Sequence, residues 1–183
     1  MSYSLGILDQ SPIIEGATNE QTLQKTVALA QKAEKLGYSR FWVSEHHHTD
    51  SLAGTSPEVL VSYLLAKTKS INIGSGGVML QHYSPYKVAE NFHVLASLEP
   101  GRVDLGIGKA PGGLPLSTKA LQYGTLNNGG DFKERLIFLQ QLIEQSIPNE
   151  HELYGIQATP IPKIKPTLFL LGASQKVLLL QVN

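Results

Sequence analysis

Short apolar runs alternate with longer helical patterns along the chain, at regular spacing. Apolar runs of a few residues favour buried strands, and apolar stripes with a period near 3.6 favour helices. The second, third and fourth runs begin at residues 40, 71 and 102, which leaves room for one helix between successive strands. This repeat predicts parallel strands joined by right-handed crossovers. The predicted strands span residues 5–8, 40–44, 71–73, 102–105 and 167–171.

Helix start and stop signals occupy the segments between these runs. Thr18 and Gln21 have the spacing of a capping box, and Gly37 suits the C-terminal end of the same helix. Ser56-Pro57 and Ser84-Pro85 each combine a capping serine with a first-turn proline. The positions predicted to face the core are Leu23, Val27, Ala30, Leu60, Val61, Leu64, Leu65, Val88, Phe92, Leu95, Phe132, Leu136, Leu139 and Ile143.

The repeat fits two architectures of the α/β class. A doubly wound open sheet would be complete with five strands, whereas a (β/α)8 TIM barrel typically needs about 250 residues. In the second case this 183-residue chain is a single domain, the N-terminal part of a barrel with about five βα units. Residues 107–130 are rich in glycine and proline, and we interpret them as a long loop inserted at the active site. A helix from about Asp131 to Ser146 and a helical pattern from Ser174 follow.

Composition and charge narrow the class of protein. Hydrophobic residues make up 42% of the chain and charged residues 16%, which favours a folded chain with a buried core. Basic and acidic residues number 15 each, so the chain has no net positive charge to attract a nucleic acid, and nucleic-acid binding is not expected. The absence of cysteine excludes disulfides, thiolate metal sites and cysteine nucleophiles. No signal peptide and no membrane-spanning run is visible, which predicts a soluble cytoplasmic protein.

Glycine-rich segments after the third and fourth runs do not match nucleotide-binding motifs. In Gly74-Ser-Gly-Gly77 the third glycine of a dinucleotide fingerprint would fall at Met79, and the segment 106–111 fails in the same way. The segment from Gly124 to Asp131 has the glycine spacing of a P-loop but lacks its Lys-Ser/Thr pair. Both nucleotide-binding classes are therefore disfavoured.

A run of three histidines follows the second predicted strand, where a barrel would build its active site. Strand alternation places His46 and His48 on one side of the chain, and Glu45 and His47 on the other. A histidine at a strand end can titrate near neutral pH and act as a general base or acid. We interpret His46 as such a general base or acid, and His48 as a loop residue without a catalytic role.

A metal site is the alternative for the histidines. Histidines two residues apart can bind zinc, but such a site needs a third protein ligand. His82 and His93 are candidates, although no spacing selects either of them. We therefore expect no metal.

One basic side chain follows the fourth predicted strand among glycines. Lys109 lies within the glycine-rich segment 106–113, and a cation beside exposed backbone amides suits a phosphate group. Gly172-Ala-Ser-Gln175 follows the fifth strand and opens a helical pattern, which provides a second potential anion site. An ordinary solvated lysine is the alternative for Lys109 alone.

Several segments at or after the predicted strands also form an ordered set over residues 3 to about 176. They are Leu8-Asp-Gln-Ser-Pro12, Trp42-Val-Ser-Glu-His-His47, Leu52-Ala-Gly-Thr-Ser-Pro-Glu58, Gly74-Ser-Gly-Gly-Val-Met-Leu80, His82-Tyr-Ser-Pro85, Val88-Ala-Glu-Asn91 and Gly106-Ile-Gly-Lys-Ala-Pro-Gly-Gly113. This set resembles the bacterial luciferase-like flavin-dependent monooxygenases, within which the luciferase-like class oxidoreductases are the most similar group. An ordered set of this kind is far more specific than any single motif.

The resemblance implies a barrel enzyme that binds reduced FMN supplied by a separate flavin reductase, normally as a homodimer. Reduced flavin and O2 then oxidise a small organic substrate, an aldehyde in the luciferases. A deazaflavin is the alternative cofactor, because related barrels use it. By position, the resemblance makes His46 the catalytic histidine. Gly76 and Gly77 match a turn under the isoalloxazine ring that can contain a non-proline cis peptide, and Lys109 and Ser174 match the contacts to the FMN phosphate.

The C-terminal end departs from the family pattern. The family continues with three more βα units, whereas here Val177-Leu-Leu-Leu-Gln-Val-Asn183 follows the fifth strand. We therefore expect a barrel truncated before closure, and a frameshift or premature stop near Lys176 is the hypothesis that explains the tail. The functional alternative is a non-catalytic half-barrel that binds flavin passively or associates with a partner chain through its open edges.

Overall fold

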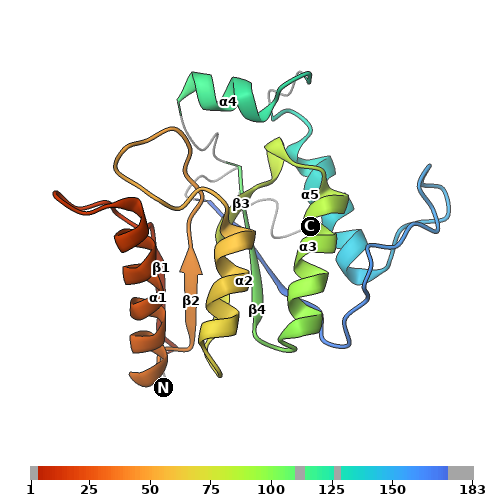
Figure 1. Ribbon diagram of the computed structural model, residues 1–183. Coiled ribbons are helices and arrows are strands. Elements are labelled where there is room, and N and C mark those ends of the chain that lie inside the picture. The colour runs from red at the N-terminus through yellow and green to blue at the C-terminus, as the bar shows by residue number, and fades with distance from the viewer. Residues whose placement is uncertain (1–3, 110–113, 126–128, 173–183) are drawn as a thin grey trace.

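A single parallel sheet organises the chain (Figure 1). The computed structural model describes residues 4–109, 114–125 and 129–172. Five strands lie in chain order, each hydrogen-bonded in parallel to the next. All five predicted strands are confirmed, and their bounds are β1 (Gly6–Asp9), β2 (Arg40–Val43), β3 (Asn72–Met79), β4 (Val103–Gly108) and β5 (Thr167–Leu171).

Helices connect successive strands, and α1, α2 and α3 stand on the same side of the sheet (Figure 1). The short helix α4 lies beyond the C-terminal ends of the strands (Figure 1). Sequential parallel strands with helices on one side are the arrangement of a β/α barrel wall. The helices are α1 (Asn19–Lys35), α2 (Pro57–Lys67), the 3₁₀ turn η1 (Leu80–His82), α3 (Pro85–Leu98), α4 (Pro115–Leu121) and α5 (Phe132–Glu144).

The sequence signals explain most of the helix ends. The Thr18 hydroxyl accepts from the Gln21 amide at 3.2 Å, while the Gln21 side chain accepts from the Thr18 amide at 3.0 Å, which is the predicted capping box. Gly37 has φ +80°, as expected just beyond a helix C-terminus. The serines before α2 and α3 differ from the expectation. Ser56 and Ser84 hold the N-cap positions, but neither side chain makes a capping hydrogen bond.

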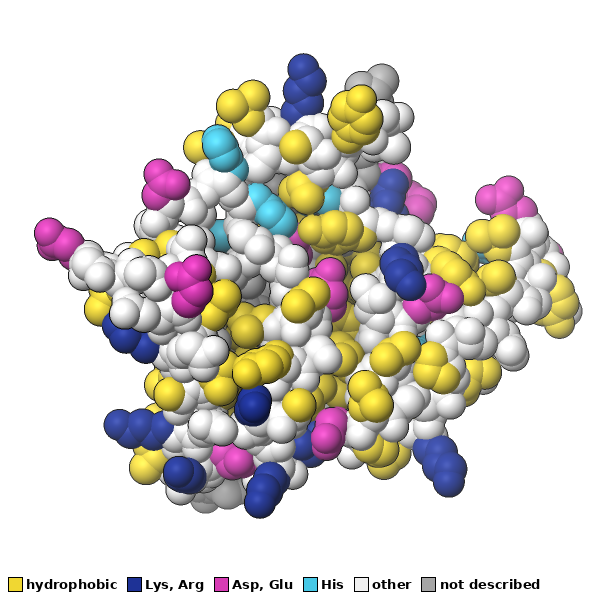
Figure 2. Space-filling model, viewed as in Figure 1, with side chains coloured by type: hydrophobic (Ala, Val, Ile, Leu, Met, Phe, Trp, Pro, Cys, Tyr) yellow, Lys and Arg dark blue, Asp and Glu magenta, His cyan; other side chains and the backbone are white. Residues whose placement is uncertain are grey.

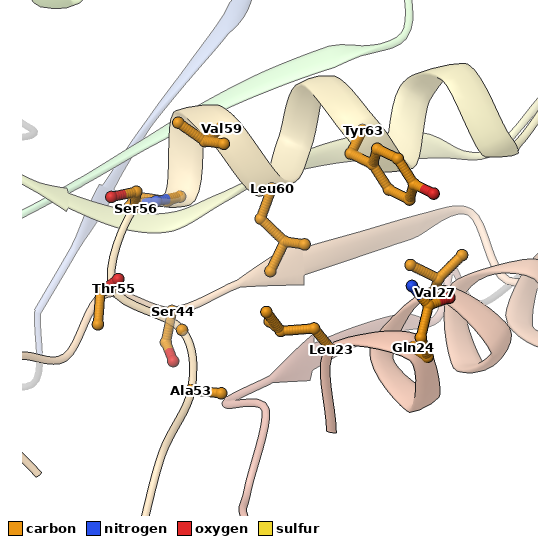
Figure 3. A pocket seen from close by; sticks show the side chains of 12 residues that line it. Leu23, Gln24, Val27, Ser44, Ala53, Thr55, Ser56, Val59, Leu60 and Tyr63 are labelled. Carbon is orange, nitrogen blue, oxygen red and sulfur yellow. The ribbon is translucent and has the colours of Figure 1, made fainter. Parts of the chain in front are cut away.

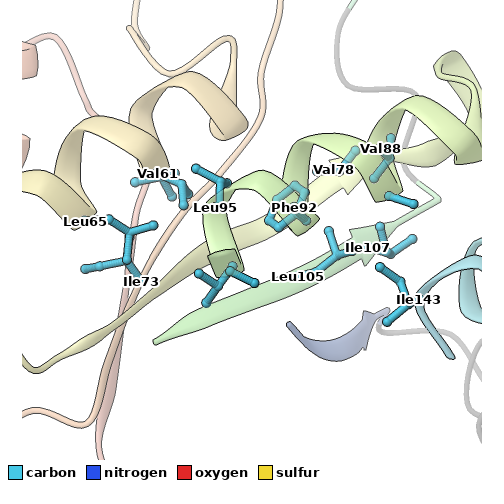
Figure 4. Packing of buried hydrophobic residues seen from close by; sticks show 14 of the residues in the cluster. Val61, Leu65, Ile73, Val78, Val88, Phe92, Leu95, Leu105, Ile107 and Ile143 are labelled. Carbon is cyan, nitrogen blue, oxygen red and sulfur yellow. The ribbon is translucent and has the colours of Figure 1, made fainter. Parts of the chain in front are cut away.

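The core lies between the sheet and the helices. Phe41 and Val43 of β2 and Ile73 of β3 are fully buried beneath the helices. Figure 4 shows Val61 and Leu65 of α2, and Phe92 and Leu95 of α3, turned toward the strands. Every position predicted to face the core is buried, except Leu23 and Leu60, which are half-buried. Leu23 and Leu60 instead line a groove between α1 and α2.

The other face of the sheet carries a polar and aromatic layer. Trp42 Nε1 donates to Asp104 Oδ2 at 2.8 Å, and Asn72 Nδ2 donates to Asp104 Oδ1 at 3.3 Å. Arg40 Nε lies 3.5 Å from Asp104 Oδ2, and the rings of Trp42 and Phe169 meet edge to face at 4.9 Å. Asp104 is fully buried, so these donors offset the cost of removing its carboxylate from water. The layer fixes the Trp42 indole on this face.

The segment 107–130 is only partly the loop that its composition indicated. Strand β4 continues through Gly108, and residues 115–121 form α4, which begins with Pro115 at its first turn. Gln122, just after α4, contacts His82 Nδ1 through its side-chain amide at 3.2 Å. This contact links the segment to the end of β3 through η1. Whether the segment serves the active site stays a prediction.

None of the helices among the described residues combines the length and the apolar character needed to cross a membrane.

Candidate active site

The candidate site forms where β2, β3 and β4 end. Because the strands are parallel and adjacent, their C-terminal ends lie along one edge of the sheet. Met79 pairs with Gly108, so the end of β3 lies beside the residue that precedes Lys109. Glu45, two residues after β2, accepts a hydrogen bond from the Met79 amide at 2.9 Å. The fold thus brings three sequence-predicted segments together.

Glu45 is the most connected side chain at this edge. Its carboxylate is fully buried, and Oε1 accepts from the Tyr83 hydroxyl at 2.5 Å and lies 2.7 Å from His47 Nε2. Burial and the hydrogen bond to Glu45 raise the pKa of the Tyr83 phenol, because both disfavour a phenolate beside a carboxylate. Both effects favour the neutral phenol, which is the form that donates to Glu45.

His46 and His47 are held by different partners. The Oγ of Ser44 lies 3.1 Å from His46 Nδ1, and the His46 amide donates to the Gly54 carbonyl at 2.9 Å. The bond between Glu45 and His47 agrees with the predicted alternation, which placed these two side chains on one side. His48 has φ +54° and an exposed side chain, as a loop residue would.

Gly76 and Gly77 lie where β3 departs from regular pairing with β4, between Ser75 and Val78. The peptide bond between them is cis, which agrees with the expectation for this turn. A methyl group at Gly76 would lie 2.6 Å from Leu8 Cδ1 and 3.3 Å from Trp42 Cβ. One at Gly77 would lie 2.6 Å from the Gly106 carbonyl oxygen. Neither glycine has room for a side chain and both remain partly exposed, which is compatible with close approach of a flat ring to the backbone.

Lys109 is an exposed cation at the end of β4. Its Nζ lies 5.7 Å from the ring centroid of Phe132, at the start of α5. A methyl group at Gly129 would lie 3.7 Å from Lys109 Cε, and nothing lies within 4 Å of the Cβ position of Gly108. A positive charge beside open backbone fits a phosphate group. Ser174 lies outside the described residues, and β5 ends three residues before it.

His82 and His93, the candidate third ligands of a metal site, contact other groups of the protein. His93 is fully buried on α3, and its Nδ1 lies 2.7 Å from the Ala158 carbonyl oxygen. His82 contacts Gln122. Within residues 4–109, 114–125 and 129–172, no three histidine, aspartate or glutamate side chains gather closely enough to hold a metal ion.

A separate groove of about 410 Å³ lies between α1 and α2. Figure 3 shows Leu23 and Val27 of α1 facing Leu60 of α2 across it. Ser44 and Gly54, which both contact His46, line the groove as well as the candidate site. The groove therefore lies behind the histidines, on the helix side of the sheet.

Sequence reasoning did not find Tyr83 or Asp104. Each binds a partner far away in the chain, since Tyr83 meets Glu45 38 residues earlier and Asp104 meets Trp42 62 residues earlier. No local pattern encodes such contacts. The one available signal was Glu45 itself, because a carboxylate at the end of a buried strand requires donors.

The fold and the strand-end site define a β/α barrel protein, and comparison with known proteins gives its family. Residues 4–181 match the family model described as luciferase-like monooxygenase, so the chain belongs to the luciferase-like monooxygenase family. It is 54% identical over 170 residues to N-acetyl-S-alkylcysteine monooxygenase of Bacillus subtilis, covering 93% of this chain and 51% of that protein. It is 36% identical over 175 residues to a luciferase-like monooxygenase of Escherichia coli K12, covering 94% of this chain and 50% of that protein.

Solved structures agree with this family. Apo-MsnO8 superposes with a TM-score of 0.85 at 38% identity, covering 95% of this chain and 51% of that chain. The oxygenating constituent of 3,6-diketocamphane monooxygenase from Pseudomonas putida, solved with FMN, gives a TM-score of 0.75 at 21% identity, covering 94% and 52%. An F420-dependent secondary alcohol dehydrogenase gives a TM-score of 0.68 at 19% identity, covering 97% of this chain and 54% of that chain. The last two show the fold alone.

The chain spans about half the length of the curated relatives that it matches. The prediction of an α/β fold corresponding to part of a TIM barrel, rather than a doubly wound sheet, is confirmed.

Proposed function

We propose that this chain takes part in a flavin-dependent monooxygenase reaction, in which reduced FMN and O2 oxidise a small organic substrate. The observation that carries the proposal is the meeting of three segments at one sheet edge: the Glu45–His47 strand end, the bare backbone of Gly76–Gly77, and the Lys109 cation. Family membership supports the reaction class.

Each segment has a part in this proposal. Gly76 and Gly77 would lie against the isoalloxazine ring, while Lys109 and Ser174 would bind the phosphate. His46 would handle a proton of the reacting groups through Nε2, because its Nδ1 is occupied by Ser44. When bound, reduced FMN supplies two electrons to O2, so that one oxygen atom enters the substrate and the other leaves as water.

The cofactor class is supported by two related folds, one solved with FMN and one that depends on F420. We favour FMN over a deazaflavin because a relative with 54% identity is a monooxygenase by name. Two substrate classes are candidates. Aldehydes are the class expected from the resemblance to luciferases, and thioethers follow from the name of the relative in Bacillus subtilis.

Incorporation of isotopic oxygen tests the reaction. The purified chain is mixed anaerobically with chemically reduced FMN and then exposed to ¹⁸O2 with a long-chain aldehyde or an N-acetyl-S-alkylcysteine. We expect mass spectrometry to find one ¹⁸O atom in the oxidised product, at a rate above that of free reduced FMN. Label only in hydrogen peroxide, with none in an oxidised product, would contradict the proposal and favour a half-barrel that binds flavin passively.

The proposal includes two partners. A flavin reductase would supply reduced FMN, and replacing the chemical reductant by NADH and a reductase should then sustain product formation.

A second copy of the chain would form a homodimer. Figure 2 shows hydrophobic side chains gathered over the α2 and α3 face, which includes the exposed residues Val59, Tyr63, Val94 and Leu98. Light scattering on the same sample gives the mass, and a strict monomer would contradict the homodimer.

Lys109→Ala is expected to weaken FMN binding about 10-fold, because a charge-assisted hydrogen bond is worth roughly 1.5–3 kcal/mol and 1.4 kcal/mol is tenfold in affinity. Affinity for riboflavin, which lacks the phosphate, should stay unchanged. Quenching of Trp42, the single tryptophan of the chain, measures both affinities.

Lys119→Ala is the matched control for Lys109→Ala, since Lys119 is also an exposed lysine and lies on α4. It should bind FMN as the unchanged protein does. If Lys109→Ala lost as much affinity for riboflavin as for FMN, the lysine would not contact the phosphate.

A further inference from the structure

Glu45 is a buried carboxylate surrounded by hydrogen-bond donors. Its side chain is fully buried, and Tyr83 donates to Oε1 while the Met79 amide donates to Oε2. Met79 ends β3 and Tyr83 follows η1, so the continuous stretch 79–83 supplies both donors to the carboxylate. A buried carboxylate is costly unless such donors satisfy its oxygens. This arrangement suits the ionised form, which only accepts hydrogen bonds.

His47 is the third contact of this carboxylate, with Nε2 at 2.7 Å from Oε1. Because an ionised carboxylate only accepts, this short contact requires a hydrogen on Nε2. In the neutral imidazole, the hydrogen then cannot be on Nδ1, which is left as an acceptor. His47 keeps 14% of its side chain exposed, whereas Glu45 has none exposed.

His46 lacks such a fixed partner. The Ser44 hydroxyl at 3.1 Å from its Nδ1 can donate or accept, so it is compatible with either tautomer. The two neighbouring histidines therefore differ in chemistry: His46 can change its tautomer during a reaction, while His47 is held in one. The carboxylate that holds His47 is also bonded to Met79, two residues after Gly77.

We propose that Glu45 is a positioning residue that holds neutral His47 in the Nε2–H tautomer and so leaves His47 Nδ1 as a hydrogen-bond acceptor. This inference does not depend on the function proposed above, because the tautomer follows from the contacts of the protein alone.

Imidazole ¹⁵N NMR tests the tautomer without any flavin. Long-range ¹H–¹⁵N spectra of the histidine-labelled chain distinguish a nitrogen that carries hydrogen from one that does not, and His47→Asn identifies the His47 signals by their loss. At a pH where His47 is neutral, we expect a single Nε2–H pattern. A single Nδ1–H pattern, or an even mixture of the two tautomers, would overturn the proposal.

Two variants separate positioning from a purely structural role. Glu45→Ala removes the acceptor, so the single Nε2–H pattern of His47 should be lost. Tyr83→Phe removes a donor to the same oxygen but keeps the carboxylate, so the pattern should persist. If Glu45→Ala does not fold, the spectrum of the unchanged protein and of Tyr83→Phe still decides the question. An unchanged His47 pattern in a folded Glu45→Ala protein would contradict positioning.

The outcomes also separate this inference from the proposed function. A fixed Nε2–H tautomer in a chain that forms no ¹⁸O product would leave the positioning role standing and remove the monooxygenase proposal. Product formation in a chain whose His47 shows mixed tautomers would support the monooxygenase proposal and overturn the positioning role of Glu45.

Discussion

Substitution of His46 by alanine is expected to lower the rate of ¹⁸O-labelled product formation by about 10²–10⁴-fold, the usual contribution of a positioned acid or base. His46 is half-buried at the end of β2, and its backbone amide, which is bonded to Gly54, is unaffected by the change. FMN binding should therefore change little. Initial rates with saturating reduced FMN measure the loss.

His48→Asn is the matched control for His46→Ala. His48 is exposed and has φ +54°, a conformation that asparagine tolerates well. We expect product formation and FMN affinity to stay at the level of the unchanged protein. If His46→Ala retained the full rate, the catalytic role of His46 would be wrong, and His47 would become the remaining histidine candidate at this strand end.

Gly106→Ala is expected to destabilise the fold by about 3 kcal/mol, at the upper end of the usual range for overpacking. A methyl group there would overlap the carbonyl oxygen of Ser75 on the adjacent strand. Ser75 cannot turn away easily, because its hydroxyl donates to the Gly106 carbonyl at 2.9 Å and accepts from the Gly106 amide at 3.0 Å. The change would force β4 away from β3. Urea unfolding followed by circular dichroism measures the loss.

Gly108→Ala provides the comparison on the same strand. Nothing lies within 4 Å of the Cβ position of Gly108, so the added methyl group meets no clash. We expect its unfolding midpoint to stay close to that of the unchanged protein. Equal stability of the two variants would mean that the spacing between β3 and β4 is looser than the structure shows.

The strands and most helices could be predicted because local signals encode them. The apolar stripe of α3, for example, repeats at Val88, Phe92 and Leu95, and all three are buried. The Thr18–Gln21 capping box and the positive φ of Gly37 are also local properties. Such signals act within one helical turn, so the sequence alone reveals them.

The contacts that shape the site could not be predicted in the same way. Helix α4 was missed because its seven residues are too few to show periodicity. The strand β3 extends through Met79 although glycines fill its middle, because pairing with β4 overrides their weak strand preference. The bond of Tyr83 to Glu45 depends on how η1 folds back over the end of β2. The strand-end positions and the resemblance to the family both indicated His46 and Lys109, whereas neither indicated a partner for Glu45.

The central claim is that the strand ends beside Trp42 form a flavin site. Trp42 is held by Asp104 and lies next to Gly76, and no other tryptophan interferes with its emission. Titration of the purified chain with FMN, followed by Trp42 fluorescence, tests the claim most directly. Saturable quenching that weakens in Lys109→Ala would agree with it, whereas emission that does not respond to FMN would contradict it.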